Sequence, residues 1–340
     1  MTTHDLAATA KALVSPGRGI LAADESHGTI EKRFKSINLA NTEENRRAYR
    51  QMLFASPGVG EYISGVILFD ETLRHKADDG QPFAELLVKQ GSIPGIKVDK
   101  GAKALAGFPG ELITEGHDGL RERLAEYFKL GARFTKWRAV ITIGSGIPTN
   151  FCIDANAHAL ARYAALSQEQ GLVPIVEPEV LMDGGHPIER CEEVTEATLK
   201  RVFMALFAHR VSLEEMLLKP NMVISAKNCP VQAGVEQVAE ATVRCLRRTV
   251  PASVPGVVFL SGGQSPEVAT AHLNAMNALG GLPWELSYSY GRALQDEALK
   301  AWGGQATGVV AGQKAFLKRS KCVSAARYGK YSKQMELSAA

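Results

Sequence analysis

Short runs of apolar and β-branched residues recur along this chain, and longer stretches with helical periodicity separate them. Eight of these runs have the length of a strand, and they cover residues 19–24, 63–69, 95–99, 134–143, 173–179, 217–224, 256–263 and 285–290. Strand-like runs that alternate with helical stretches are typical of βα units around a parallel sheet. The sequence therefore predicts an α/β fold with eight parallel strands.

Several of the intervening helices have readable ends. Helices are predicted over 118–131 and 154–170, because each stretch opens with an aspartate that can cap it and closes at a glycine. Ser265-Pro266-Glu267 combines a cap residue, a proline at the first helical position and an acid in the first turn. Gly280-Gly281 is expected to end that helix.

Eight strands in 340 residues favour a (β/α)8 TIM barrel that occupies residues 1–340 as a single domain, with about 303–340 as a C-terminal helix and tail. An open doubly wound sheet is the alternative, but no GxGxxG follows the first strand. Proline cannot donate to a central ladder, so Pro174, Pro178 and Pro220 are awkward. Pro178 and Pro220 are placed where strands leave the barrel, while Pro174 stands as an objection.

Composition narrows the class of protein. The net charge of +3 argues against a nucleic-acid binder with a basic face. The five cysteines are spread out and form no CxxC, so neither a disulfide framework nor a zinc site is indicated. Residues 1–16 lack a signal-peptide pattern, and the apolar runs are too short to span a bilayer. We expect a cytoplasmic protein with no membrane partner.

Lys219 is a lone cation in the otherwise apolar run Leu217-Leu218-Lys219-Pro220-Asn221-Met222-Val223. An ordinary lysine has a pKa of about 10.4, so near neutral pH roughly one side chain in a thousand is a free amine. Burial beside other cations favours the neutral form, which is the nucleophile toward carbonyls. Taken alone, the segment fits a lysine that extends its head group to water from a strand end even better.

Other charged residues fall at the predicted carboxyl ends of strands, where TIM barrels carry their catalytic groups. They are Asp24, Lys97, Lys136, Arg138, Glu177, Glu179, Lys219 and Arg292. Lys136 and Arg138 lie two positions apart and so share a strand face, as do Glu177 and Glu179. An ion pair at the barrel mouth explains any one of them. Together they must pair with each other, with water or with a ligand, and the excess of cations indicates an anionic ligand.

Two places suit the anion. Ser261-Gly262-Gly263 follows the seventh predicted strand and Gly291-Arg292 the eighth. The loops after these strands commonly bind phosphate in this fold. Lys32-Arg33, after Ser26 and Thr29, is a second candidate, although a solvated helix face explains it equally well. Two phosphates at opposite ends of one substrate account for both clusters.

A neutral lysine beside a carboxylate predicts imine chemistry on a carbonyl substrate. The iminium formed on Lys219 is an electron sink for the carbanion left when a neighbouring C–C bond breaks. Glu177 would move the hydroxyl proton that starts retro-aldol cleavage, with a pKa raised by the apolar run before it. Lys136 would lower the pKa of Lys219 by repulsion between like charges.

Over about residues 17–302 the chain resembles class I fructose-bisphosphate aldolase, the metal-independent Schiff-base enzyme. The resemblance rests on motifs in the family's order: Leu21-Ala22-Ala23-Asp24-Glu25-Ser26, Gly95-Ile96-Lys97-Val98-Asp99-Lys100-Gly101, Lys136-Trp137-Arg138, Pro174-Ile175-Val176-Glu177-Pro178-Glu179, Leu218-Lys219-Pro220-Asn221-Met222, Leu260-Ser261-Gly262-Gly263-Gln264-Ser265 and Ser289-Tyr290-Gly291-Arg292-Ala293-Leu294. It implies reversible cleavage of fructose 1,6-bisphosphate to dihydroxyacetone phosphate and glyceraldehyde 3-phosphate, in glycolysis and gluconeogenesis. It also implies a homotetramer without a metal or other cofactor.

The resemblance also assigns roles. Lys219 would form the Schiff base, with Glu177 as general acid and base and with Asp24 and Lys136 assisting at the cleaved bond. The substrate-binding residues would be Ser261, Gly262, Gly291 and Arg292 for one phosphate, Ser26, Thr29 and Lys97 for the other, and Arg138 and Glu179 along the site.

The chain departs from the family pattern in two places. His27 stands where threonine is usual, a change expected to alter phosphate affinity modestly. Animal and plant members end in a mobile segment whose terminal tyrosine aids proton exchange on the enamine, but no tyrosine follows Tyr331 here. Either Tyr328 or Tyr331 substitutes for it, or enamine protonation is slow.

Three other functions compete with this interpretation. A Schiff-base aldolase for another phosphosugar is the nearest. A metal-dependent aldolase fits poorly, because the eight histidines are scattered without paired ligand spacing. A non-catalytic phosphate-binding scaffold is a third, against which the presence of Lys219, Glu177 and Asp24 argues.

Overall fold

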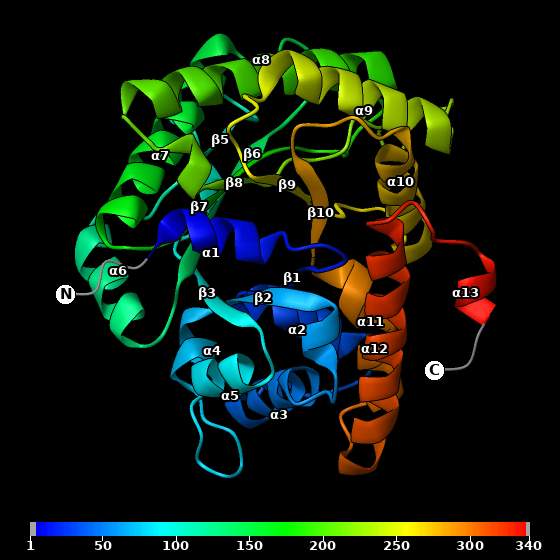
Figure 1. The fold of residues 1–340 in the computed structure, drawn as a ribbon. Helices are drawn as coiled ribbons and strands as arrows, with labels where there is room; N and C mark the ends of the chain where they lie inside the picture. The colour runs from blue at the N-terminus through cyan, green and yellow to red at the C-terminus, as the bar shows by residue number, and fades with distance from the viewer. Residues whose placement is uncertain (1–4, 338–340) are drawn as a thin grey trace.

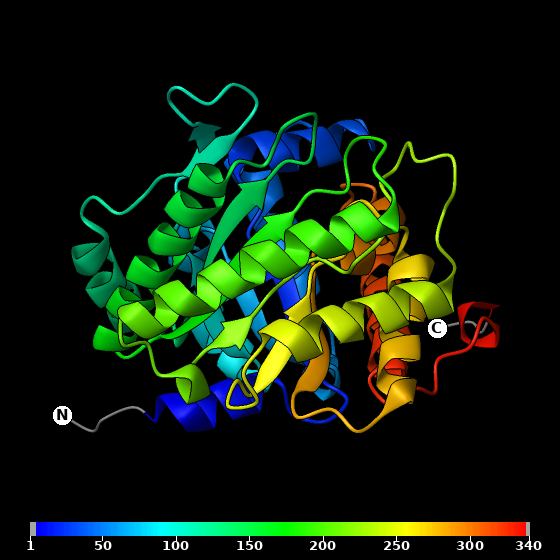
Figure 2. The ribbon, with the colours of Figure 1, turned by 90° about the horizontal axis from the view of Figure 1, so that it is seen from above.

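The computed structural model describes residues 5–337, within which eight parallel strands close into a barrel (Figures 1 and 2). Neighbouring strands follow the order β1, β10, β9, β8, β7, β6, β3, β2. Their bounds are Gly19–Ala23 (β1), Ile63–Leu68 (β2), Ile93–Lys97 (β3), Phe134–Ile141 (β6), Val173–Val180 (β7), Leu217–Leu218 (β8), Gly256–Phe259 (β9) and Glu285–Tyr290 (β10). The predicted TIM barrel is confirmed, and each predicted run overlaps one of these strands.

Helices surround the barrel (Figure 1). They are α1 (Leu6–Leu13), α2 (His27–Lys35), α3 (Glu43–Phe54), α4 (Asp70–Arg74), α5 (Phe83–Lys89), α6 (Leu120–Lys129), α7 (Asn150–Glu169), α8 (Ile188–Ala208), α9 (Val235–Thr249), α10 (Pro266–Leu279), α11 (Arg292–Trp302), α12 (Val309–Ala326) and α13 (Gln334–Leu337), with 3-10 turns at Val59–Glu61, Leu213–Glu215 and Ala306–Gly308. In residues 5–337, none of the helices has both the length and the apolar character that crossing a membrane requires.

The predicted helix boundaries hold to different degrees. Ser265 caps α10 by accepting the N–H of Val268, as expected. Helix α6 begins just after the predicted aspartate. Helix α7 begins four positions before Asp154, because the Thr149 side chain accepts the N–H of Cys152 and caps the helix there. A small antiparallel hairpin between β3 and β6, β4 (Ala102–Ala104) with β5 (Leu112–Thr114), was not predicted.

The two prolines of β7 lie where the strand needs few backbone N–H donors, on the edge that faces β8. Backbone N–H groups alternate in direction along a strand. The N–H groups of Val173 and Leu181 donate to carbonyls on the β6 side, whereas that of Val180 turns toward Asn221, beyond β8. Pro174 and Pro178 lie an even number of positions from Val180, so their backbone nitrogens face the same neighbour, β8. That strand pairs with β7 only at Ile175 and Val176. The two prolines therefore remove no hydrogen bond between β7 and β8, which answers the objection raised by Pro174. Because β7 runs to Val180, the expectation that Pro178 ends the strand is wrong.

Alternate residues of the strands fill the barrel interior in two layers of opposite character. The layer near the amino ends of the strands is apolar, with Ile20, Phe134, Ile175, Leu217 and Val258 in one buried cluster. Helix α1 contributes its own buried side chains to this cluster and covers that mouth of the barrel (Figure 1). Two positions beyond Phe134, Ile175 and Leu217, the layer near the carboxyl ends carries the charged side chains of Lys136, Glu177 and Lys219.

Small residues make room for the largest ring of the apolar layer. A Cβ on Gly95 would overlap the Phe134 ring. We expect Gly95→Ala to lower the free energy of unfolding by about 1–3 kcal/mol through overpacking. Denaturant titration measures this. Gly28→Ala is the matched control, because nothing lies within 4 Å of its added methyl and it sits in α2. Equal stability of both variants would contradict the packing of Phe134.

Candidate active site

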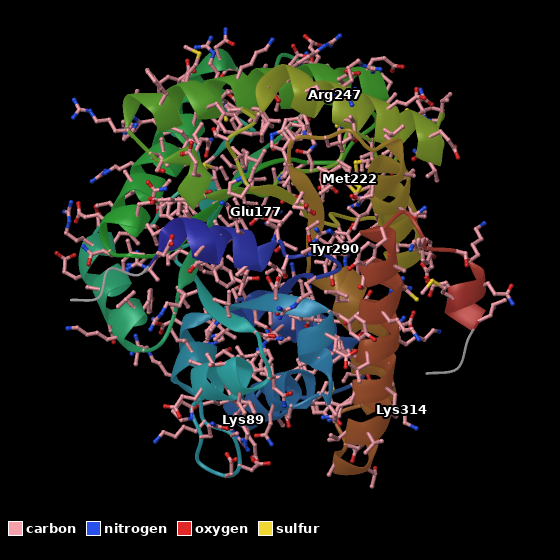
Figure 3. The ribbon with its side chains drawn as sticks, in the orientation of Figure 1. Lys89, Glu177, Met222, Arg247, Tyr290 and Lys314 are labelled. Atoms are coloured by element: carbon pink, nitrogen blue, oxygen red, sulfur yellow. The ribbon has the colours of Figure 1, made fainter. Side chains whose placement is uncertain are left out.

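The sequence-predicted site residues converge on one pocket of about 800 Å³ at the carboxyl ends of the strands. All thirteen line it, namely Asp24, Ser26, Thr29, Lys97, Lys136, Arg138, Glu177, Glu179, Lys219, Ser261, Gly262, Gly291 and Arg292. Figure 3 places Glu177 within the ring of helices, whereas Lys89, Arg247 and Lys314 lie on the outer elements. The period of two along a strand directs Lys136 with Arg138 and Glu177 with Glu179 inward together, and the segments that follow β1, β8, β9 and β10 bring in the residues outside the strands.

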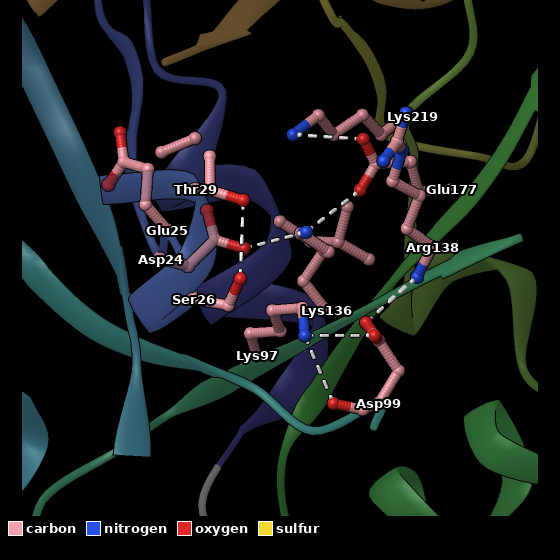
Figure 4. Close-up of polar contacts among 12 residues, drawn as sticks. Asp24, Glu25, Ser26, Thr29, Lys97, Asp99, Lys136, Arg138, Glu177 and Lys219 are labelled. Atoms are coloured by element: carbon pink, nitrogen blue, oxygen red, sulfur yellow. Dashed lines mark hydrogen bonds and ion pairs between the residues drawn. The ribbon is translucent and has the colours of Figure 1, made fainter. Parts of the chain in front are cut away.

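Four of these residues form a buried row of alternating charge (Figure 4). Lys136 Nζ lies 2.7 Å from Asp24 Oδ2 and 3.2 Å from Glu177 Oε2. The other oxygen of Glu177, Oε1, lies 3.2 Å from Lys219 Nζ. The side chains of Lys136, Glu177 and Lys219 are 4–5% exposed, so the charges neutralise one another with little help from water.

The two lysines of this row have opposite pKa shifts. Burial lowers the pKa of Lys219, with a further lowering from the positive charge of Lys136, and these outweigh the opposing effect of Glu177. Burial also acts to lower the pKa of Lys136, but the carboxylates of Asp24 and Glu177 overcome it and hold that pKa well above its usual range. Lys136 is thus a permanent cation, and Lys219 is the amine that can lose its proton.

The expected rise in the pKa of Glu177 is wrong in direction. Burial does act to raise this pKa, but Lys136, Lys219 and Arg138 outweigh it and lower the pKa below its usual value. The pKa of Asp24 is also held well below its usual range, because Lys136 and Lys219 outweigh burial. Both carboxylates are therefore ionised in the free site at neutral pH.

Asp99 joins the site without having been proposed for it. Its Oδ1 lies 2.9 Å from Lys97 Nζ, and its Oδ2 accepts the backbone N–H of Arg138. The Arg138 side chain in turn pairs with Glu179. The signal was present in the sequence, because Lys97 and Asp99 are two positions apart and share a strand face.

A second group supports the Arg33 side of the pocket. Glu25 is buried and pairs with both Arg33 and Arg50, while Gln295 donates to its Oε1. Arg33 lines the pocket, so this carboxylate sets its position. The partners come from α2, α3 and α11, and Gln295 lies 270 positions from Glu25, so no local pattern reveals the group.

The glycine-rich loops after β9 and β10 meet at the same pocket. Gly262 has a φ of 56°, a left-handed conformation that favours glycine. Its carbonyl accepts a hydrogen bond from the Arg292 side chain, which ties the two loops together. Ser289 was missed, although it lines the pocket and its buried Oγ has no hydrogen-bond partner among residues 5–337.

Across the pocket, Ser26 occupies the N-cap position of α2 without a capping bond from its side chain, and its Oγ lies 3.2 Å from Thr29 Oγ1. The neighbouring His27 turns aside, with Nε2 3.3 Å from Glu71 Oε1 and its ring edge against Phe69. His27 does not line the pocket.

The two tyrosines considered for proton exchange lie elsewhere. Tyr328 packs over Gly17, which precedes β1 at the amino-terminal side of the barrel. The Tyr331 hydroxyl donates to Glu336, and its backbone N–H donates to Asn274. Residues 338–340, the end of the tail, lie outside the described residues.

The chain is similar over nearly its whole length to known proteins. The model of the family described as "Glycolytic: Fructose-bisphosphate aldolase class-I" matches residues 5–340. A probable fructose-bisphosphate aldolase class 1 from Xanthomonas campestris pv. campestris is 61% identical over 97% of this chain and 99% of the relative. The fructose-bisphosphate aldolase of Dictyostelium discoideum is 55% identical over 96% of this chain and 93% of its own.

A solved structure is also similar. The fructose-bisphosphate aldolase of Plasmodium falciparum, in a complex with TRAP and a small-molecule inhibitor, superposes with a TM-score of 0.95 at 52% identity. The match covers 96% of this chain and 95% of the other. Fold, charged pocket and full-length similarity agree, and the chain belongs to the class-I fructose-bisphosphate aldolase family.

Proposed function

We propose that Lys219 is the Schiff-base nucleophile in the reversible cleavage of fructose 1,6-bisphosphate to dihydroxyacetone phosphate and glyceraldehyde 3-phosphate. The observation that carries this assignment is the buried contact between Lys219 Nζ and Glu177 Oε1 at 3.2 Å. An amine with a lowered pKa beside an ionised carboxylate is an activated nucleophile with its proton acceptor in place.

Imine formation follows from this pair. Glu177 accepts a proton from the Lys219 ammonium, and the amine lone pair then attacks the C2 carbonyl carbon of the open-chain sugar. A proton moves from the new ammonium nitrogen to the alkoxide, which gives the neutral carbinolamine. The resulting carbinolamine hydroxyl takes the proton back from Glu177 and leaves as water, which gives the iminium. Because Glu177 begins ionised, it acts first as a base and then as an acid.

Cleavage uses the same groups. Glu177, again a carboxylate, accepts the C4 hydroxyl proton while the C3–C4 electron pair moves into the iminium, so that glyceraldehyde 3-phosphate leaves and an enamine remains. Protonation at C3 and hydrolysis then release dihydroxyacetone phosphate. Asp24 stays ionised throughout and holds Lys136, whose cation stabilises negative charge on the oxygens at the cleaved bond.

The two anion sites divide the substrate between them. We assign one phosphate to Ser261, Gly262, Gly291 and Arg292 and the other to Ser26, Thr29 and Lys97, with Arg138 and Glu179 between them. This division is supported by the lining of a single pocket with cations from several strands, a lining that a bisphosphate would neutralise. A sugar with one phosphate would leave one of the two sites unfilled.

The setting of the enzyme is part of the proposal. A cytoplasmic location is supported by the similarity to a cytosolic aldolase of Arabidopsis thaliana, 57% identical over 96% of this chain. The homotetramer follows from the resemblance to the family, and association of copies is supported by large apolar side chains exposed at the end of α8, where Met204 is 65% and Phe207 86% exposed.

Reduction with borohydride in the presence of dihydroxyacetone phosphate tests the nucleophile. We expect peptide mass spectrometry to find the trapped adduct on Lys219, because a reduced imine is a stable secondary amine. Lys219→Met should give no adduct and lose at least about 10³-fold in kcat. An adduct on Lys97 or Lys136 in the unaltered enzyme would show that these roles are wrongly assigned.

The pKa of Lys219 can be measured separately through its pH-dependent labelling with trinitrobenzenesulfonate. Only the neutral amine reacts, so labelling falls as the pH drops through the pKa. Lys136→Met removes a like charge, and we expect the pKa of Lys219 to rise, which slows labelling near neutral pH. Lys97→Met, which also removes a pocket cation, should leave the labelling profile in place. An unchanged profile in Lys136→Met would contradict the proposed repulsion.

Proton exchange on the enamine tests the tyrosines. Because Tyr328 and Tyr331 lie away from the pocket, we expect the double variant Tyr328→Phe with Tyr331→Phe to exchange the C3 proton of dihydroxyacetone phosphate at the rate of the unaltered enzyme. Nuclear magnetic resonance in deuterated water follows this exchange. A loss of tenfold or more would mean that one of them reaches the enamine after all.

A further inference from the structure

Two loops form a lip beside the Ser261-Gly262 side of the pocket. One is the β7–α8 loop, residues 181–187, and the other runs from Lys219 to α9, residues 219–234. Three backbone hydrogen bonds near 2.9 Å join them, from Ala226 N to His186 O, from Lys227 N to Met182 O and from Asn228 N to Gly184 O. These bonds hold the two loops together through their backbones, so the side chains of the lip are not needed for that purpose and can contact a ligand.

Lys227 projects from this lip over the glycine-rich loop. Its Nζ lies 2.9 Å from the position that a Cβ on Gly263 would occupy, and it lines the same pocket as Ser261 and Arg292. In this state the ammonium pairs with Asp183 Oδ1 at 2.8 Å. The side chains of Lys227 and Asp183 are 45% and 60% exposed, and ion pairs this open to water hold weakly.

The backbone N–H of Gly263 is committed to a poor acceptor. It donates to the thioether sulfur of Met182 at 2.9 Å. Sulfur in a thioether accepts hydrogen bonds weakly, whereas an oxyanion on a backbone N–H forms a strong, charge-assisted bond. Met182 therefore occupies a donor that a phosphate oxygen would take over readily.

We propose that Lys227 is an additional phosphate-binding residue. Its ammonium breaks the ion pair with Asp183 and contacts the phosphate held at Ser261 and Gly262. The Gly263 N–H then donates to the same phosphate instead of to Met182. Asp183 competes with the ligand for the ammonium, so it moderates affinity. This inference rests on the proposed assignment of Ser261, Gly262, Gly291 and Arg292 to a phosphate.

A cycle of three variants tests the proposal. Lys227→Met should raise KM for fructose 1,6-bisphosphate and the inhibition constant of inorganic phosphate about tenfold, with kcat within about twofold, because binding is lost equally in the ground and transition states. Asp183→Asn should lower KM about twofold to threefold by removing the competitor. The same change in the Lys227→Met background should have no effect, which marks the two side chains as coupled.

Lys200→Met is the matched control for charge. Lys200 lies on α8 and pairs with Glu196 at 2.6 Å, with a side chain 54% exposed, so its removal changes net charge equally at a similar surface pair. Its KM should stay within about twofold of the unaltered enzyme. Parallel thermal unfolding shows whether each variant is folded.

The outcomes separate this inference from the assignment beneath it. An unchanged KM in Lys227→Met, with a KM raised tenfold or more in Arg292→Ala, overturns the role of Lys227 and leaves the phosphate site standing. An unchanged KM in both variants overturns the phosphate site together with the inference. A higher KM in Asp183→Asn also overturns it, because the pair would then only position the lip.

Discussion

Mutual neutralisation of buried charges is the constraint on which this molecule depends. Asp24, Lys136, Glu177 and Lys219 lie in or directly after four different strands and meet where water has little access. Each would be costly to bury alone, and the row is stable only because cation and anion alternate along it. The barrel supplies this alternation, since its period of two directs charged side chains inward above an apolar layer that anchors the same strands.

Most of the site was predictable because strand periodicity is local. Lys136 and Arg138 share a face whatever the rest of the chain does, and so do Glu177 and Glu179. The pKa of Glu177 was not predictable in this way, because its direction is set by cations that other strands bring within reach. Sequence shows the apolar run before Glu177, which acts to raise the pKa, but it does not show the charges that outweigh this effect.

The same distinction applies to the fold. Eight strand-like runs predict the barrel because each run is a contiguous signal. Pro174 could not be explained from the sequence, because whether a strand tolerates a proline depends on the neighbouring strand. Here β8 is only two residues long, so the edge of β7 that lacks an N–H donor has little to pair with. The cap of α7 at Thr149 and the support of Arg33 by Glu25 likewise depend on contacts that residue order alone leaves open.

Helix α1 gives the pocket a kinetic property. Because its side chains close the amino-terminal mouth with packed apolar groups, the reaction chamber is a tube with a single open end. Substrate and products share this opening, and in the proposed mechanism the ketone fragment stays bound to Lys219 inside it. The aldehyde, which carries no such tether, departs first in the cleavage direction and arrives second in the synthetic one. The proposed bond to Lys219 thus sets the order in which the two products are exchanged, and the mouth closed by α1 confines that exchange to one opening.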